Sequence, residues 1–170
     1  MGGLRCVDGS YLTVTPVACT DSVGAPYEIT LELHRDGTPY GSVGERCGHL
    51  LARLAHGVDE ARQGRGAATR WADPDDRFPG EEPDGELFSF RYLTRAGRGG
   101  GELRCQLRTI PVWQPGPGEW RLTRRAYVEA WGATGVGMRA VLTSAELSVF
   151  VRQLVNEAEG CLKGGESAEE

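Results

Sequence analysis

Residues 142–155 read LTSAELSVFVRQLV, and this stretch decides the fold of the C-terminal part of the chain. Thr143 stands three residues before Glu146, which is the spacing of a capping box: the hydroxyl accepts from a free N–H of the first turn, and the glutamate reaches back. Leu142 and Leu147 are spaced to form a hydrophobic staple. An apolar stripe follows at Leu147, Phe150, Val151, Leu154 and Val155. The pattern predicts an amphipathic helix that ends near residue 161.

The same signature occurs at Ser42 and Glu45. The apolar stripe that accompanies it consists of Val43, Cys47, Leu50, Leu51 and Leu54. We therefore expect a helix over residues 43–56, with Gly57 placed to end it. The segments before and between the two helices have a period of two. The plan is thus strands, helix, strands, helix.

The clearest strand spans residues 27–35, where Tyr27, Ile29, Leu31 and Leu33 alternate with polar residues. Similar patterns predict strands over residues 11–18, 88–92, 102–110, 119–131 and 138–142. Short connections between consecutive strands favour antiparallel pairing. The expected fold class is α+β: a mainly antiparallel sheet of about six strands, in the order ββα-ββββα, covered by two amphipathic helices.

The length of 170 residues predicts one α+β domain, residues 1–163, followed by a disordered tail, residues 164–170. Residues 58–86 form a long connection, and its second half, 73–86, is rich in acidic residues and proline. A connection of this length without strong periodicity is either mobile or functional, and we expect residues 58–86 to be a mobile, solvated loop.

Composition also bears on where the protein works. No apolar run approaches the roughly 20 residues of a membrane span, and the first residues lack the pattern of a signal peptide. We predict a cytoplasmic protein without a membrane partner. Lys163 is the only lysine among 19 basic residues, and glycine is abundant, a bias typical of GC-rich genomes such as those of actinobacteria.

Signatures of catalysis are missing from the sequence. It holds no Gly-x-Ser-x-Gly elbow and no Gly-Lys-Ser/Thr phosphate loop, and the glycine-rich stretches 97–101 and 132–137 are expected to be turns. The five cysteines form no C-x-x-C pair, and Cys47 and Cys105 are expected to be small buried hydrophobes. We therefore predict no catalytic residue, cofactor or metal. A weaker alternative is an acid–base or metal site at His34 and Glu32, which share a strand face.

Positive charge is concentrated in one region. From Arg91 to Arg139 there are nine arginines and three acidic residues, a charge of +6, whereas the remainder of the chain carries −11. Strand alternation places several of these arginines on one sheet face together with aromatic rings. The candidate binding residues are Arg104, Arg108, Arg121, Arg125, Tyr127 and Trp131. Guanidinium groups bind phosphate or carboxylate in a bidentate way and stack on rings.

Such a face can bind an acidic protein segment or a single-stranded nucleic acid, or it can pair with the acidic segment of its own chain. The net charge of −5 disfavours nonspecific binding to nucleic acid. We predict a non-catalytic bacterial interaction or regulatory module that binds a protein partner through this face or the acidic segment. The alternatives are a single-stranded nucleic-acid-binding protein, an immunity or antitoxin-like protein, and a small-molecule enzyme whose site converges from loops. A homo-oligomer is compatible with all of them.

Short motifs resemble one known family. They are Pro26-Tyr27-Glu28-Ile29 leading to Leu33-His34, then Leu50-Leu51-Ala52, Gly64-Arg65-Gly66, Arg70-Trp71 and Pro74, and finally Val141-Leu142 before the last helix. In this order they look like the SsgA-like regulators of sporulation and cell division in filamentous actinobacteria. The resemblance covers about a third of the chain, and residues 80–137 depart from it. It implies a non-enzymatic protein that recruits division machinery, with a fold related to single-strand-binding Whirly domains. No functional residue is carried over.

Overall fold

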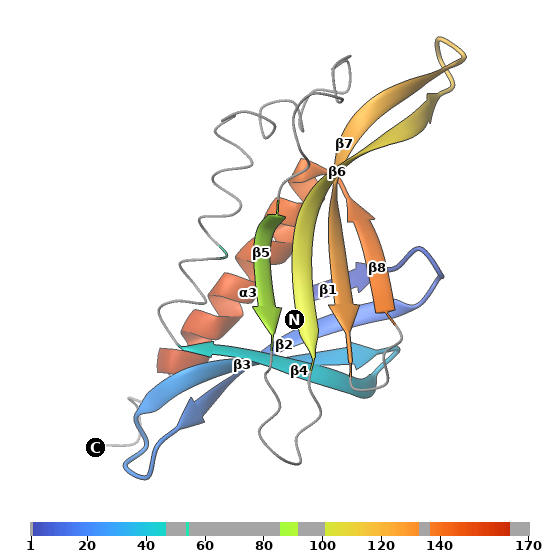
Figure 1. The fold of residues 1–170 in the computed structure, drawn as a ribbon. Helices are drawn as coiled ribbons and strands as arrows, with labels where there is room; N and C mark the ends of the chain where they lie inside the picture. Colours follow the sequence, from blue (N-terminus) through green and yellow to red (C-terminus); the bar gives the residue numbers. More distant parts are fainter. Residues whose placement is uncertain (1, 47–53, 55–85, 92–100, 133–136, 164–170) are drawn as a thin grey trace.

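Two four-stranded antiparallel sheets and a long helix make up the described part of the protein (Figure 1). The computed structural model describes residues 2–46, 54, 86–91, 101–132 and 137–163. The first sheet, in strand order, consists of β1 (Gly2–Arg5), β2 (Tyr11–Thr20), β3 (Pro26–Arg35) and β4 (Thr38–Arg46). The second consists of β5 (Glu86–Arg91), β6 (Glu102–Gln114), β7 (Glu119–Trp131) and β8 (Gly137–Leu142). Each strand therefore pairs with the next one along the chain.

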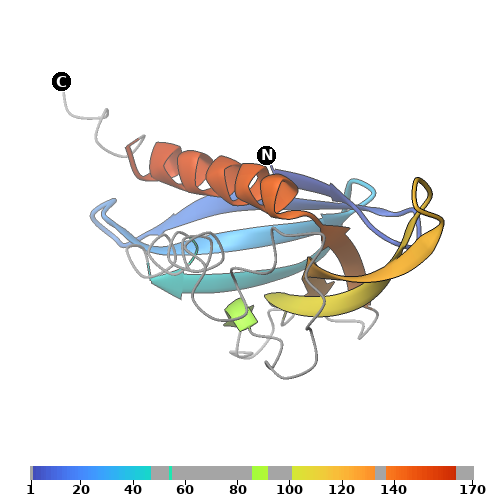
Figure 2. The same ribbon diagram turned by 90° about the horizontal axis from the view of Figure 1, so that it is seen from above.

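Helix α3 (Ser144–Lys163) follows β8 directly and packs against β1 and β2 of the first sheet and against β7 and β8 of the second. Figure 2 shows α3 running along the first sheet. The apolar side chains that α3 buries are four of the five residues of the predicted stripe, together with Ala158, whereas Val155 is only partly buried. The buried ones are Leu147, Phe150, Val151, Leu154 and Ala158. They join residues of both sheets in one hydrophobic cluster.

The predicted capping box begins α3. The Thr143 hydroxyl accepts from the backbone N–H of Glu146 at 3.3 Å and donates to the Glu146 carboxylate at 2.9 Å. The same carboxylate lies 3.5 Å from the backbone nitrogen of Thr143. These contacts satisfy backbone donors that the first turn of a helix leaves free. The prediction of this helix is confirmed.

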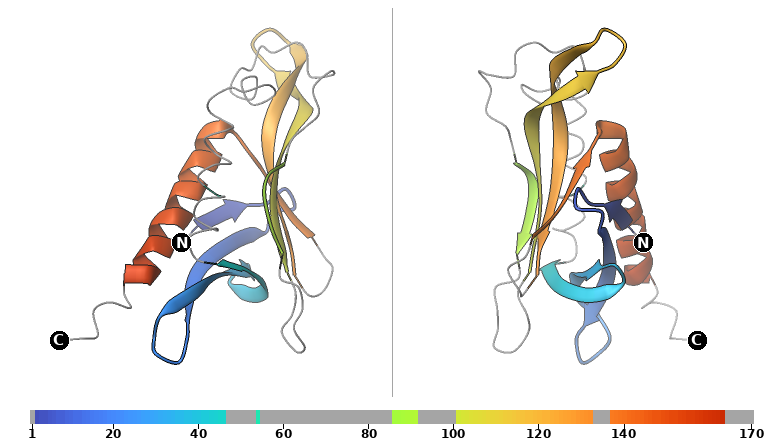
Figure 3. Two further views of the ribbon diagram at one scale, coloured as in Figure 1. Left: turned by 60° about the vertical axis from the view of Figure 1, so that its left-hand side comes forward. Right: turned by 90° about the vertical axis from the view of Figure 1, so that its right-hand side faces the viewer.

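Strands of the two sheets cross at a steep angle, and β4 contacts β5 and β6 where the sheets meet (Figure 3). Two glycines make the close approach possible. A Cβ atom built on Gly101 would lie 2.6 Å from the carbonyl oxygen of Ser42, and one built on Gly132 would overlap the carbonyl oxygen of Tyr40. Backbone thus packs directly on backbone at this junction.

The predicted fold class is confirmed at the level of a mainly antiparallel α+β protein. All six predicted strands are present, and β3 buries Ile29, Leu31 and Leu33 as expected. Tyr27, which was expected on the same buried face, is 55% exposed at the beginning of the strand. The finer prediction was wrong: the described residues form eight strands in two sheets rather than about six in one, and among them one long helix, rather than two, packs on the sheets.

The predicted start of a helix at Val43 was also wrong. Residues 38–46 form β4, so Ser42 and Glu45 lie in a strand and make no capping box. Asp36 and Gly37 have φ angles of 49° and 81° and connect β3 to β4 by a two-residue turn. Asp-Gly is a strong signal for such a hairpin, which pairs the following residues with β3. Leu54, from the later part of the predicted helix, is helical and fully buried.

Several predictions fall outside the described residues. These are the remainder of the helix over 43–56, the mobile loop 58–86 except Glu86 at the start of β5, most of the glycine-rich turns 97–101 and 132–137, and the tail 164–170. The boundary of a single domain at residue 163 also stays a prediction.

Candidate binding surface

One face of the second sheet gathers arginines and aromatic rings. Because side chains alternate along a strand, the residues of β6 that lie opposite buried Leu103, Cys105 and Leu107 point away from the core. The register places Arg104 opposite Glu129, and Arg108 opposite Arg125. We call this surface the arginine face. It consists of Glu102, Arg104, Gln106 and Arg108 from β6, Arg125, Tyr127, Glu129 and Trp131 from β7, and Arg139 from β8.

A buried carboxylate lies at the centre of the arginine face. Glu129 is only 3% exposed, although it stands on the face that points away from the core. Gln106 Nε2 donates to its Oε1 at 2.6 Å, and Arg139 Nη2 donates to its Oε2 at 3.2 Å. Arg104 Nη2 lies 3.6 Å from Oε1. The carboxylate therefore joins three polar side chains from β6 and β8.

These contacts set the protonation of Glu129. Burial by itself raises the pKa of the carboxyl group. The hydrogen bonds from Gln106 and Arg139, together with the charges of Arg139 and Arg104, outweigh burial, so the pKa lies below its ordinary value. Glu129 is ionised at neutral pH and holds two guanidinium groups in place.

Both aromatic rings of the face carry guanidinium groups. The guanidinium carbon of Arg104 lies 4.9 Å from the centroid of the Trp131 ring. Those of Arg108 and Arg139 each lie 5.4 Å from the centroid of the Tyr127 ring. These separations are typical of cation–π contacts.

Five of the six predicted binding residues thus lie on the arginine face: Arg104 contacts Glu129 and Trp131, Arg108 lies over Tyr127, and Arg125 stands opposite Arg108. The sixth, Arg121, is on the same side of β7 but further along the strand, where its Nε donates to Glu119 at 2.7 Å. Glu129 and Arg139 also belong to the face, although neither was predicted as a binding residue. The signal was present, because Glu129 shares its parity with Arg125 and Trp131, and only residues 132–136 separate β7 from β8.

The acid–base or metal site predicted at His34 and Glu32 lies on the first sheet, away from the arginine face. Both residues line an open pocket of about 420 Å³ on β3 and β4, together with Tyr40 and Ser42. The side chains of His34, Glu32 and Ser42 make no hydrogen bond to one another in the described part of the chain. Among the residues that the structure describes, no three His, Cys, Asp or Glu side chains are grouped as a metal site requires.

Cys105 is fully buried in the core as predicted. Burial, with a smaller effect of Glu129, raises the pKa of its thiol.

Comparisons of the chain with protein-family models, with curated proteins and with solved structures give no match. The resemblance to SsgA-like regulators therefore stays a prediction. Within the described ranges, no helix has the length and apolar character needed to cross a membrane.

Proposed function

We propose that this protein is a non-catalytic interaction module that binds an acidic segment of a protein partner through the arginine face. The observation that carries the proposal is that Arg104 and Arg139 contact the buried carboxylate of Glu129, and that three arginines of the face lie over two aromatic rings. The face combines four arginines with two glutamates, Glu102 and Glu129, and so keeps an excess of positive charge.

The chemistry of the face favours carboxylate ligands. A guanidinium group presents several N–H donors in one plane and can bind a carboxylate with two parallel hydrogen bonds. Arg104 and Arg139 keep 26% and 45% of their side-chain surface exposed, although both contact Glu129. The exposed part of Arg139 keeps donors for an incoming acidic side chain, whereas the Nε of Arg104 is buried and has no hydrogen-bond partner among the described residues.

Preorganisation supports the same conclusion. A long arginine side chain normally loses conformational entropy when it binds a ligand, which weakens the complex. Glu129 and the two rings already restrict Arg104 and Arg139 in the free protein. Less entropy is then lost on binding, so a modest number of contacts can give a useful affinity.

Single-stranded nucleic acid is the less favoured ligand. Binding of single strands relies on open ring faces on which bases stack. Three guanidinium groups lie over Trp131 and Tyr127, so a base would have to displace them before it could stack. The net charge of −5 for the whole chain also opposes binding to a polyanion of high charge density.

Fluorescence anisotropy with defined probes tests this proposal. We expect labelled poly-L-glutamate to bind at low salt and to weaken as salt rises, because exposed charge interactions are screened. A labelled oligo-dT of similar length should bind more weakly at each salt concentration. Tighter binding of oligo-dT, or no binding of poly-L-glutamate at low salt, would contradict the proposal.

Two finer predictions stay within the same class of protein. The resemblance to SsgA-like regulators and the immunity-like role both imply a non-enzymatic protein that acts by binding another protein. Neither role identifies the acidic partner. The expected binding of poly-L-glutamate is the same for both roles.

A further inference from the structure

The β6–β7 hairpin extends beyond both neighbouring strands. Pairing of β6 with β5 ends at Gln106, and pairing of β7 with β8 ends at Ala126. Residues 107–125 therefore form a two-stranded ribbon, which we call the β6–β7 arm. Figures 1 and 3 show the arm projecting from the body of the molecule, at the opposite end from the β2–β3 turn.

The end of the arm is uncharged and aromatic. The ten residues 109–118 read TIPVWQPGPG and contain no charged side chain. Trp113 and Trp120 lie directly opposite each other across the two strands, and their rings make an edge-to-face contact with centroids 5.5 Å apart. They are 48% and 67% exposed, and Trp120 is the most exposed aromatic residue within the described ranges. The Gly118 N–H donates to the Gln114 carbonyl at 2.9 Å and closes the turn, so the exposed rings are held on a defined hairpin.

Positive charge lies behind this uncharged end. The arm contains four arginines, at positions 108, 121, 124 and 125, and one acidic residue, Glu119, which gives a net charge of +3. This sum already includes the ion pair of Glu119 with Arg121. Because the whole chain carries −5, the residues outside the arm carry −8. The arm therefore has the opposite charge to the rest of the molecule, and its end can meet an anionic surface while the acidic groups stay further away.

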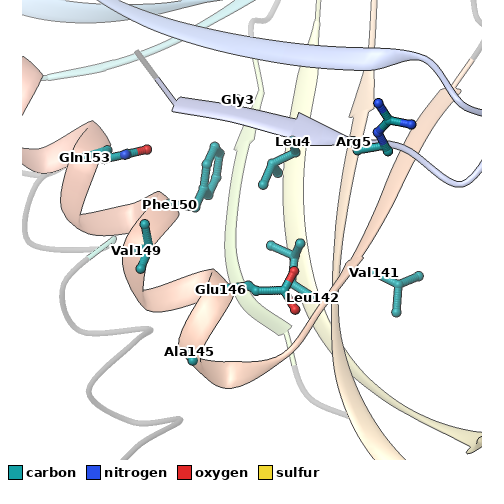
Figure 4. Close-up of a pocket in the computed structure, with 10 residues that line it drawn as sticks. All are labelled: Gly3, Leu4, Arg5, Val141, Leu142, Ala145, Glu146, Val149, Phe150 and Gln153. Atoms are coloured by element: carbon teal, nitrogen blue, oxygen red, sulfur yellow. The ribbon is translucent and has the colours of Figure 1, made fainter.

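The recess between β1, β8 and the first turns of α3 offers no comparable surface (Figure 4). Its volume is about 420 Å³, but the apolar side chains of Leu4, Leu142 and Phe150 that line it are at most 7% exposed. Arg5 and Glu146 line the same recess, so its charges are mixed. Only the arm combines exposed rings with an excess of one charge among these two features.

An anionic lipid surface matches both properties of the arm. Tryptophan is enriched at the membrane interface, because its ring is apolar and its N–H reaches polar groups at the headgroup level. One apolar element alone attaches a protein weakly, and basic residues near anionic lipids supply the second contribution that stable attachment needs. An acidic protein surface would match the arginines but would leave the two exposed rings without apolar surroundings.

The spacing along the arm suits this arrangement. Arg108 and Arg125 stand opposite each other, each five residues from a tryptophan, which is roughly 17 Å along a strand. Side chains that bind in the interface enter it by about 5–10 Å. Arg108 and Arg125 would then lie about 7–12 Å from the headgroups, close to the Debye length of about 8 Å at physiological ionic strength. Their charges would still act on the lipids.

We propose that the β6–β7 arm attaches the protein to the surface of an anionic membrane, with Trp113 and Trp120 in the interface and the arginines towards the lipid headgroups. The arm would enter the interface without crossing the membrane. This proposal revises the prediction of no membrane partner, which was based on the lack of an apolar run long enough to span a bilayer. The two tryptophans lie outside the arginine face, so the proposal does not rest on the proposed function.

Flotation with lipid vesicles tests this proposal. We expect the protein to float with vesicles made of equal parts of phosphatidylglycerol and phosphatidylcholine, and to bind pure phosphatidylcholine at least about tenfold more weakly. Brominated phosphatidylcholine in the anionic vesicles should quench tryptophan fluorescence, because the bromine atoms reach only rings that enter the membrane. No flotation with the anionic vesicles, or flotation without quenching, would overturn the proposal.

The Trp113→Phe/Trp120→Phe double variant identifies the rings that enter the membrane. Phenylalanine keeps an aromatic pair on the hairpin, which protects its fold, but removes both indoles. We expect the double variant to lose most of the quenching by brominated lipid. Undiminished quenching would show that tryptophans outside the arm enter the membrane, and would overturn the proposal.

Two single substitutions should change the affinity for anionic vesicles in opposite directions. Trp120→Ala should weaken binding at least about tenfold, because a large apolar side chain no longer leaves water. Glu119→Gln removes the only acidic residue of the arm and should strengthen binding about fivefold, a gain that damage to the hairpin cannot produce. Tyr27→Ala is the matched control, because Tyr27 is an aromatic residue, 55% exposed, at the start of β3. Equal weakening by Tyr27→Ala, or weaker binding of Glu119→Gln, would contradict the proposal.

The same experiments separate membrane attachment from the proposed function. Trp120→Ala should bind labelled poly-L-glutamate as the wild type does, since Trp120 is not part of the arginine face. Binding of poly-L-glutamate without binding of vesicles would overturn the membrane proposal alone, and the reverse result would overturn the proposed function alone. Vesicle binding that is lost in Arg108→Glu but unchanged in Trp120→Ala would assign the lipids to the arginine face and overturn the role of the arm.

Discussion

Arg139 donates a hydrogen bond of 3.2 Å to Glu129, its direct neighbour across the β7–β8 pair, although Glu129 is almost completely buried. A buried carboxylate is normally costly unless cations and hydrogen-bond donors surround it. Here the same contacts that stabilise Glu129 also fix the positions of Arg139 and Arg104. The stability of the sheet and the geometry of the arginine face therefore depend on one residue.

Glu129→Gln should lower the free energy of unfolding by about 2 kcal/mol. The substitution keeps the shape of the side chain but removes the charge to which Arg139 and Arg104 are bound, and charge-assisted hydrogen bonds contribute about 1.5–3 kcal/mol. Urea denaturation measures the change. Glu119→Gln is the matched control, because it affects the exposed pair with Arg121 and should cost at most about 1 kcal/mol. Equal effects of the two substitutions would contradict a special role for Glu129.

The advantage of wild type over Glu129→Gln should depend on pH. The folded state lowers the pKa of Glu129 below its ordinary value of 4.5, so the unfolded state binds the proton more tightly. The stabilisation is therefore complete above pH 4.5 and is lost as pH falls through the lower pKa of the folded state. Asp8 also has a lowered pKa, mainly because of the hydrogen bond from Ser10, but both proteins contain it and its effect cancels. Urea denaturation at several pH values checks this, and a difference that does not change with pH would contradict it.

Thr143→Ala should lower the free energy of unfolding by about 1 kcal/mol, the usual effect of losing an N-terminal capping hydroxyl. Thr143→Ser keeps the hydroxyl that contacts Glu146 and should stay close to wild type. Thermal denaturation followed by circular dichroism compares the two. If serine destabilises as much as alanine, the methyl group of Thr143 rather than its hydroxyl is responsible.

Gly101→Ala should destabilise the protein by about 1–3 kcal/mol, because its Cβ would meet the backbone of Ser42, which cannot rotate away. Gly116→Ala is the control. Its Cβ would have no atom within 4 Å, and alanine there should be neutral or slightly stabilising, since it reduces the freedom of the unfolded chain. Urea denaturation of both variants decides whether the two sheets meet at Gly101. Similar stabilities would count against this packing.

The sequence predicted an element correctly where its local pattern did not compete with another local signal. The alternation of residues 27–35 and the cap at Thr143 needed no tertiary information. The helix predicted from Ser42 and Glu45 was wrong, because the spacing of a capping box is only a local preference. Here the Asp36-Gly37 turn pairs the following residues with β3. β1 has four residues, two of them glycine, so it carries almost no period-two signal.

Two further differences between prediction and structure concern the length of β6 and the burial of Glu129. The strand predicted over residues 102–110 stops before Pro111, yet Pro111 lies within β6, beyond the point where pairing with β5 ends. There no described strand pairs with that edge of β6, and a residue without an N–H is tolerated at such an edge. The arginine face could be predicted from strand parity, but the burial of Glu129 could not, because it results from side chains of β6 and β8 closing over β7.

The most direct test of the account is the affinity of Arg108→Glu for labelled poly-L-glutamate at low salt. Arg108 lies over Tyr127 in the arginine face, whereas Arg152 is exposed on α3, so Arg152→Glu changes the net charge equally at a distant site. We predict that Arg108→Glu raises the Kd about tenfold, a loss of about 1.4 kcal/mol, and that Arg152→Glu leaves it nearly unchanged. Equal losses in both variants would mean that overall charge, and not the arginine face, governs binding.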